Sequence, residues 1–300
     1  MPCYNHGRFV GESVAAILGQ TFADLELIVV DDASKDNSVE TLRGLAQKDA
    51  RVKIIVHEQN SGPSGSRNDG LRAAVGEFVA FCDADDLWKP EKLTRQIHLL
   101  EAHSDCDITY CESEIIDETG RLTGELFSRQ FPRPPAPSGD LFEALCARNF
   151  INTQTVLARR LPLGERLLFD EHLRLAEDWW QWIRLARHHR FLYEPAVLAL
   201  YRVHPQSTGS TQKPGFIRSR CKVGRRNLRT HPDMPIGTQG IILYQIGGDL
   251  CDLGKRRRGR GFILKGLRFG WAGRLPLRRL ARMSARLALE WSRGVIPRRR

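Results

Sequence analysis

The chain has 300 residues, of which 41% are hydrophobic and 27% are charged. This is enough to bury an extensive core, and it excludes a disordered or fibrous protein. No uncharged apolar run approaches the roughly 18–20 residues that cross a bilayer. The net charge of +11 is uneven, because residues 251–300 carry 16 basic and 2 acidic side chains while the first 250 residues are close to neutral.

The chain has seven cysteines, and none of them form the C-x-x-C pair that is typical of zinc and redox sites. An odd number of cysteines in a long chain favours reduced thiols over a disulfide framework. We therefore expect a cytoplasmic protein.

Strand-like and helix-like segments alternate from residue 9 to about residue 201. Strands are predicted over 25–30, 52–56, 78–82, 106–112 and 191–201, and helices over 64–75 and 177–188, after Asn37 and from Pro90. This alternation predicts βαβ crossovers and an α/β fold whose mostly parallel sheet is flanked by helices. Ligands of such sheets bind beyond the carboxyl ends of the strands.

The pattern changes after about residue 205. Residues 131–137 are rich in proline and predict a loop, and Ser207 to Pro214 read as a polar linker. We expect one domain over 1–205 and a helical, basic C-terminal region over 206–300. Because only Met1, Pro2 and Cys3 precede Tyr4, we also expect the first strand of the sheet to be truncated and the natural start codon to lie upstream.

Three carboxylates crowd the turn after the strand over 78–82, at Asp83, Asp85 and Asp86. Ionised carboxylates this close repel one another, so a cation is a natural partner. Oxygen ligands suit Mg²⁺ or Mn²⁺. The alternative is a solvated acidic turn that caps the helix after Pro90.

Two further segments follow predicted strands. Asp32 ends the strand over 25–30, where it either forms an Asx turn with a helix cap or accepts a hydrogen bond from a ligand. The glycine-containing loop over 60–70 enters a helix and carries Arg67, an arrangement that favours anions.

The last two polar segments lie near residues 177 and 204. Glu177 and Asp178 open an amphipathic helix, where they either complement the helix dipole or supply a general base. His204 follows the last predicted strand and is interpreted as a metal ligand, a phosphate contact or neither.

Together and in this order, these segments resemble the inverting family 2 glycosyltransferases, which have the GT-A fold. The matching motifs span residues 2–204 and are Pro2-x-Tyr4-Asn5, Gln20-Thr21-Phe22, Val29-Val30-Asp31-Asp32-x-Ser34, Asn60-x-Gly62-x-x-x-x-Arg67-Asn68-x-Gly70, Asp83-Ala84-Asp85-Asp86 with Pro90, Glu177-Asp178-Trp179 and Tyr201-Arg202-x-His204.

The resemblance implies a role for each position. It assigns nucleotide-sugar binding to Pro2, Tyr4, Asp32, Arg67 and Asp83, metal binding to Asp83, Asp85 and His204, and base catalysis to Asp178. It implies metal-dependent transfer of one sugar, with inversion, from a nucleotide-diphosphate sugar such as a UDP-sugar to a surface-glycan or lipid-linked acceptor. Processive synthesis is disfavoured, since no Q-x-x-R-W motif follows Glu177-Asp178.

Two alternatives to this function stay open. A sugar-phosphate nucleotidyltransferase would need a glycine- and lysine-rich loop after the first strand, which the sequence does not contain. A non-catalytic scaffold that binds nucleotide sugars is the other alternative.

The basic C-terminal region predicts an amphipathic helix from Leu277 onward. Leu280, Ser284, Leu287, Ala288 and Trp291 share one face of this helix, with arginines roughly opposite. Such a helix either binds an anionic membrane surface, which would place the protein at the inner face of the membrane, or packs on the body with a solvated basic face. Nucleic acid is a disfavoured third partner, since no recognised binding fold surrounds the arginine runs.

Overall fold

The computed structural model describes residues 1–130, 138–205, 207 and 214–292. The predicted loop over 131–137 and most of the predicted linker lie outside these residues. The chain forms two compact units: Met1–Leu141 with Phe150–Ser207, and Phe142–Asn149 with Thr208–Arg300.

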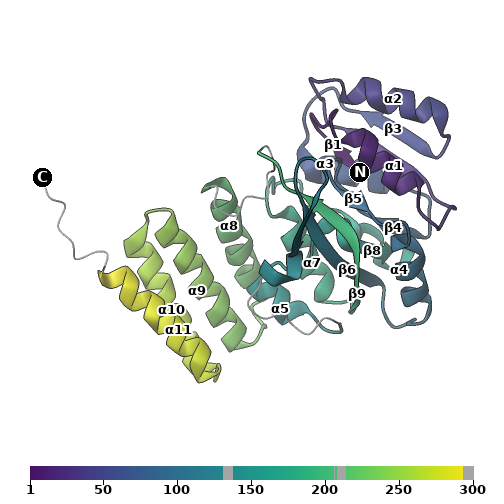
Figure 1. Cartoon of the computed structure of the whole chain (residues 1–300). Coiled ribbons are helices and arrows are strands. Elements are labelled where there is room, and N and C mark those ends of the chain that lie inside the picture. Colours follow the sequence, from purple (N-terminus) through teal and green to yellow (C-terminus); the bar gives the residue numbers. More distant parts are fainter. Residues whose placement is uncertain (131–137, 206, 208–213, 293–300) are drawn as a thin grey trace, which may run out of the picture. The chain divides into compact units, whose positions relative to one another are not determined.

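The first unit begins with a parallel three-stranded sheet. Its strands are β1 (Pro2–Cys3), β2 (Leu27–Asp31) and β3 (Val52–Val56), in the order β1-β2-β3, with α1 (Val10–Leu18) and α2 (Ser38–Lys48) in the connections (Figure 1). Every residue of β2 is buried, as its β-branched sequence predicts. The parallel register brings the chain after Cys3, Asp31 and Val56 to one edge of the sheet.

A second, mixed sheet completes the first unit. It contains β4 (Phe78–Ala80), β5 (Leu87–Trp88), β6 (Ile108–Ile116), β7 (Leu122–Leu126), β8 (Val156–Arg159) and β9 (Phe191–Arg202). Its order is β4-β8-β6-β9-β5, with β7 paired to β6. Only the β6–β9 pair is parallel among these described pairings, so the parallel arrangement expected from the alternation holds for β1–β3 and for this pair.

The remaining helices of this unit follow or precede these strands. They are α3 (Gly62–Ala73), α4 (Lys92–Glu101), α6 (Arg160–Leu163) and α7 (Glu177–Ala186), with 3₁₀ turns at Phe127–Gln130, Thr153–Thr155 and Gly164–Leu167. Helix α4 begins two residues after Pro90. Helix α2 follows Asn37 as predicted. The Asn37 side chain makes no capping hydrogen bond, and the amide of Ser38 donates to Asp36 Oδ1 at 3.0 Å.

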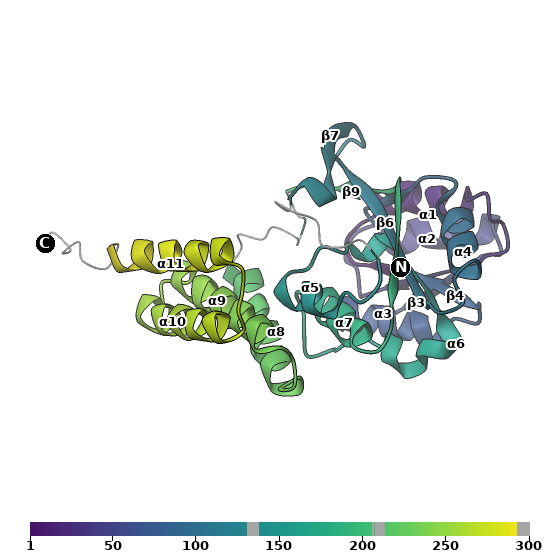
Figure 2. The same ribbon diagram turned by 90° about the horizontal axis from the view of Figure 1, so that it is seen from below.

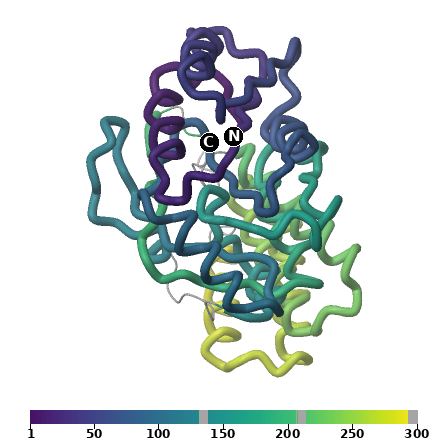
Figure 3. The backbone as a smooth tube through the Cα atoms, turned by 90° about the vertical axis from the view of Figure 1, so that its right-hand side faces the viewer, coloured from purple at the N-terminus to yellow at the C-terminus, as the bar shows by residue number. Residues whose placement is uncertain are grey.

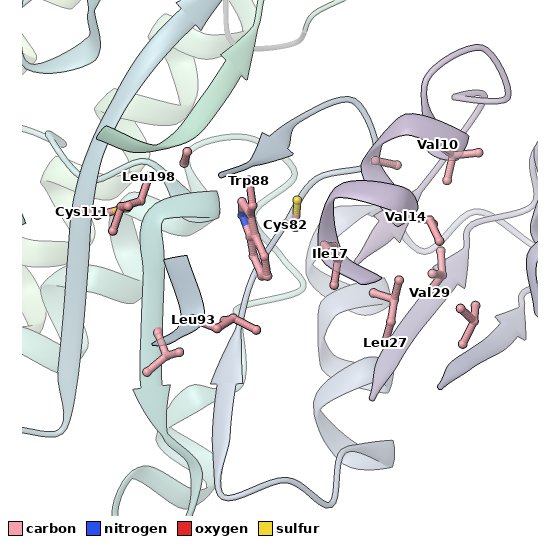
Figure 4. Close-up of a cluster of buried hydrophobic side chains, with 14 of the residues drawn as sticks. Val10, Val14, Ile17, Leu27, Val29, Cys82, Trp88, Leu93, Cys111 and Leu198 are labelled. Atoms are coloured by element: carbon pink, nitrogen blue, oxygen red, sulfur yellow. The ribbon is translucent and has the colours of Figure 1, made fainter. Parts of the chain in front are cut away.

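Apolar side chains from both sheets form the core of the first unit. Figure 4 shows Val10, Val14 and Ile17 of α1 near Leu27 and Val29 of β2, with Trp88, Leu93 and Leu198 in the same cluster. Figure 3 traces the backbone of this unit from its purple N-terminal segment into the segments coloured teal and green. All seven cysteines are buried and unbridged.

The second unit is helical. It contains α5 (Phe142–Ala147), α8 (Pro214–Thr230), α9 (Ile236–Asp252), α10 (Arg256–Ala272) and α11 (Leu277–Ser292). Helices α9 and α10 lie side by side (Figures 1 and 2). Glycines on the facing sides of the two helices allow their backbones to approach closely. A Cβ at Gly247 would lie 2.7 Å from the carbonyl oxygen of Gly259, and one at Gly240 would lie 2.9 Å from that of Gly266. None of the described helices is long and apolar enough to cross a membrane.

The apolar face predicted for α11 is only partly buried. Leu280 and Met283 are buried and Leu287 packs against them, whereas Ser284, Ala288 and Trp291 are exposed. The predicted face is therefore split, because one side of the helix packs within the second unit and the adjoining side faces solvent. Arg293 and the arginines that follow lie outside the described residues.

Lys92 gives a prediction about the core. Its side chain is fully buried, its ammonium donates to Gln96 Oε1 at 2.7 Å and lies 4.2 Å from the centre of the Trp88 ring, and burial lowers its pKa to about 8. Below pH 8 the folded state therefore bears a buried charge. Between about pH 8 and 10.5 the folded chain loses the proton that the unfolded chain keeps, so stability should rise with pH.

We expect Lys92→Met to raise the free energy of unfolding at pH 7 by about 1–3 kcal/mol. This gain should shrink as the pH rises from 8 to 10.5, measured by urea unfolding. Lys48→Met, at an exposed position of α2, is the control and should change little. Equal stability of Lys92→Met and the wild type at every pH would show that the ammonium carries no desolvation cost.

Candidate functional site

Asp32 lies at the carboxyl edge of the parallel sheet and is almost fully buried. Its Oδ1 accepts hydrogen bonds from His57 Nδ1 at 2.9 Å and from the Ser61 amide at 2.7 Å, and its Oδ2 accepts one from the Gly62 amide at 2.8 Å. Burial would raise the pKa of Asp32, but these hydrogen bonds outweigh it and hold the pKa below its usual value. Asp32 is therefore an anion that fixes the start of α3.

The segment after β1 is held in an unusual conformation. Asn5 has a φ of 56°, its amide donates to Ser34 Oγ at 2.9 Å, and its Oδ1 accepts from the Lys35 amide at 2.7 Å. The amide of His6 donates to Ser38 Oγ at 3.0 Å. These bonds fix the segment against the loop after β2. Pro2 lies in β1, and Tyr4 is 46% exposed beside Asn5.

Arg202 fastens the acidic turn to the end of β9. The Arg202 amide donates to Asp86 Oδ1 at 2.8 Å, and its Nε donates to the carbonyl oxygen of Asp85 at 2.7 Å. Its guanidinium also pairs with Glu12 at 2.7 Å. Burial, together with the nearby charges of Asp85 and Asp83, raises the pKa of Asp86 well above its usual value. Asp86 is thus a structural acid of this turn.

Asp85, whose carbonyl oxygen accepts from Arg202, also contacts His204 through its carboxylate. His204 Nε2 lies 3.0 Å from Asp85 Oδ2, and the His204 side chain is buried. One ligand atom from each of His6, Asp85 and His204 lies within 4.8 Å of the others. Within the described part of the chain, these three residues could hold a metal ion. The group includes the predicted Asp85 and His204 and adds His6, but it does not include Asp83.

Arg67 connects the acidic turn with the start of α7. Its guanidinium is buried and donates to Asp83 Oδ1 at 2.8 Å and to Glu177 Oε1 at 2.7 Å. It also lies 5.3 Å from the centre of the Phe169 ring. Burial raises the pKa of Glu177 to about 7, against the opposing charge of Arg67. Asp83 and Glu177, which are distant in sequence, therefore share one cation.

Asp178 follows Glu177 in the first turn of α7. Ala176, which precedes the helix, has a φ of 59°, and Thr153 Oγ1 donates to Asp178 Oδ2 at 3.4 Å. The charges of Asp178 and of the acidic turn both affect the phenol of Tyr201. Burial raises the pKa of Tyr201, and the charges of Asp86, Asp85, Asp83 and Asp178 raise it further. Both acidic segments thus act on one side chain.

Four of the eight predicted site residues contact one another directly, in the pairs Arg67–Asp83 and Asp85–His204. Asp85 and His204 touch each other, and Arg67 joins Asp83 to the neighbour of Asp178. Two contributors were not predicted. His6 belongs to the group of candidate metal ligands. Arg202 is part of the motif Tyr201-Arg202-x-His204, but its hydrogen bonds to the acidic turn were not predicted. The only sequence signal for His6 was its place directly after the Pro2-x-Tyr4-Asn5 motif.

Comparison with known proteins identifies the family to which the chain is similar. Glycosyl transferase family 2 matches residues 1–152, which is half of the chain. An uncharacterised glycosyltransferase of Haemophilus influenzae is 29% identical over 228 residues, which make up 75% of this chain and 71% of that protein. An uncharacterised glycosyltransferase of Rickettsia conorii is 31% identical over 186 residues, 62% of this chain and 29% of that protein.

One relative carries a specific name. The Escherichia coli protein UDP-Glc:alpha-D-GlcNAc-diphosphoundecaprenol beta-1,3-glucosyltransferase WfgD is 38% identical over 130 residues, which are 43% of this chain. The matched region spans half of WfgD and under a third of the Rickettsia protein. These lengths confine the similarity to part of those relatives.

Solved structures show the same fold. Staphylococcus aureus TarS 1–349 in complex with UDP-GlcNAc matches with a TM-score of 0.61 at 19% identity, over 91% of this chain and 86% of that chain. The Pyrobaculum calidifontis mannosyltransferase PcManGT in complex with GDP-Man and Mn²⁺ matches with a TM-score of 0.61 at 19% identity, over 96% of this chain and 79% of that chain. The fold is GT-A, as predicted.

The contacts of Arg67 generate a prediction about stability. Arg67→Met should lower the free energy of unfolding by about 3–5 kcal/mol, because it leaves Asp83 and the buried Glu177 without their counter-charge. Arg72→Met on the same helix removes an exposed pair with Asp69 and should cost less than about 1 kcal/mol. Urea unfolding at pH 7.5 measures both, and equal losses would contradict the structural role given to Arg67.

Proposed function

Because this chain belongs to glycosyltransferase family 2, we propose that it transfers a single sugar, with inversion, from a nucleotide-diphosphate sugar to a hydroxyl group of an acceptor. The observation that carries this proposal is the connection made by Arg67, which joins the acidic turn to the helix that bears the expected base. Leaving-group stabilisation and deprotonation can act on one substrate only if these segments meet.

The donor would bind at the carboxyl edge of β1–β3. Pro2 and the exposed ring of Tyr4 would contact the nucleotide. Asp32 Oδ2 accepts one hydrogen bond, from the Gly62 amide, and a carboxylate oxygen can accept a second, which the nucleotide would donate. Arg67 and Asp83 would lie toward the sugar diphosphate. A UDP-sugar is the favoured donor, and the names of WfgD and of the TarS complex, which contain UDP-Glc and UDP-GlcNAc, support this choice.

The residues at the acidic turn fit a divalent metal ion. The fit rests on the donor atoms of Asp85 and His204, 3.0 Å apart, and on His6 Nδ1, a buried atom without a hydrogen-bond partner among the described residues. Asp83, the other predicted ligand, lies outside this group of three and pairs with Arg67. When bound, Mg²⁺ or Mn²⁺ would neutralise the negative charge that develops on the departing diphosphate.

Asp178 is the proposed general base. As the acceptor oxygen attacks the anomeric carbon, the bond from that carbon to the diphosphate oxygen breaks and the hydroxyl proton passes to the Asp178 carboxylate. The attack comes from the face opposite the leaving group and inverts the anomeric configuration. Thr153, by donating to Asp178 Oδ2, would orient the carboxylate.

The acceptor is proposed to be a lipid-linked or surface glycan. The name of WfgD supports a lipid-linked acceptor, and the second unit offers a surface suited to a membrane. Leu277, Trp291, Arg278 and Arg282 of α11 are all exposed. A helix that exposes both apolar side chains and arginines fits an anionic bilayer, which would place the enzyme at the inner face of the cytoplasmic membrane.

Asp178→Asn tests the catalytic assignment. Turnover should fall about 10²–10⁴-fold because the acceptor proton loses its base, while the dissociation constant of the donor should change less than twofold. Release of nucleotide from a panel of UDP-Glc, UDP-GlcNAc and GDP-Man, with and without Mn²⁺, provides the assay. Asp24→Asn, at an exposed position, is the control. Undiminished turnover of Asp178→Asn would remove this residue as the base.

Vesicle co-sedimentation tests the membrane contact. The wild type should pellet with vesicles containing phosphatidylglycerol but not with phosphatidylcholine alone. Reversing Arg278 and Arg282 to Glu should weaken binding at least about tenfold, since each basic side chain near the surface contributes about 1 kcal/mol. Reversing Arg43 and Lys48 of α2 to Glu makes the same change in net charge and is the control. Equal pelleting of the double variant and the control would rule out this face of α11.

A further inference from the structure

His6 is the donor at the acidic turn that no sequence motif assigned. It follows Asn5, whose positive φ turns the chain after β1, and its amide donates to Ser38 Oγ at 3.0 Å. Since Ser38 opens α2, the backbone of His6 is held by the adjoining loop and helix. The imidazole is therefore placed by a fixed, locally strained segment, as functional groups often are.

The surroundings of the His6 ring leave one nitrogen available. Nδ1 is buried and has no hydrogen-bond partner among the described residues. A buried polar atom without a hydrogen-bond partner costs free energy, so we expect a ligand to bind to this nitrogen. The ring stands edge-on to that of His204, with 6.1 Å between centroids, and Phe9 lies against both histidines. Phe9 gives the pair an apolar wall.

The separations of the donor atoms suit one ion. Ligands that each lie about 2.1 Å from an ion are at most about 4.2 Å apart. The donor atoms of His6, Asp85 and His204 all lie within 4.8 Å of one another, and the Asp85–His204 pair is already at 3.0 Å. Movements of a few tenths of an ångström in the side chains bring all three donors to a common centre.

We propose that His6 is a third protein ligand of the metal ion, and that the resulting set of two imidazoles and one carboxylate makes this site select Mn²⁺ over Mg²⁺. Mg²⁺ prefers oxygen ligands and keeps its waters, whereas imidazole nitrogen suits first-row transition metals. The inference rests on the metal dependence of the proposed function. It adds one consequence, which is that three protein ligands should hold the ion without any nucleotide.

Mn²⁺ binding to the nucleotide-free protein tests the inference. Titration followed by the electron paramagnetic resonance signal of free Mn²⁺ should give one tight site in the wild type, which tenfold excess Mg²⁺ does not empty. His6→Ala should weaken Mn²⁺ binding at least about tenfold, since loss even of residues that only orient a ligand costs 10–100-fold. His98→Ala, an exposed histidine of α4, is the matched control.

A second measurement on the wild type avoids any effect of His6→Ala on folding. Electron spin-echo modulation of bound Mn²⁺ should show two coupled imidazole nitrogens. One coupled nitrogen, unchanged affinity in a folded His6→Ala, displacement by Mg²⁺ or no binding without nucleotide would each overturn the inference. The proposed function would survive these results, because Asp85 and His204 could still hold an ion together with the donor diphosphate. Metal-independent turnover would instead contradict the proposed function.

Discussion

Electrostatic repulsion among crowded carboxylates is the constraint on which this site depends. Five of them come from two segments about 90 positions apart, Asp83–Asp86 and Glu177–Asp178. Buried carboxylates this close are tolerated only when cations, hydrogen-bond donors or protonation relieve their repulsion. Arg67 forms ion pairs with Asp83 and Glu177, and the Arg202 amide donates a hydrogen bond to Asp86. Asp85 is then the member of the acidic turn that faces imidazoles, which is where a divalent ion would complete the compensation.

The same compensation explains how the two sheets cooperate. Arg67 lies in α3, whose first amides are fixed by Asp32 at the edge of the parallel sheet, and its guanidinium reaches the start of α7. Arg202 ends β9 of the mixed sheet and holds the turn after β4. The carboxyl edge of the parallel sheet, the acidic turn and the proposed base are therefore positioned by buried contacts, so a change at one of them should affect the others.

The sequence predicted the elements with strong local signals. The apolar, β-branched runs at β2 and β3 were located to within two residues, and the ordered motifs named the family. Strands β5, β7 and β8 were missed, because they have two to five residues and β7 is mostly exposed. The metal group was predicted only in part, since nothing periodic marks His6. The predicted apolar face of α11 is only partly buried, because amphipathic spacing does not tell which side of a helix packs on neighbouring helices.

The central claim is that both acidic segments act on one substrate. A crystal structure with Mn²⁺ and an unhydrolysable UDP-sugar analogue, with the ion located by anomalous scattering, tests it most directly. We predict an ion bonded to Asp85 and His204, with the anomeric carbon of the sugar lying between this ion and the Asp178 carboxylate. An ion bound elsewhere, or an Asp178 side chain directed away from the sugar, would contradict the account.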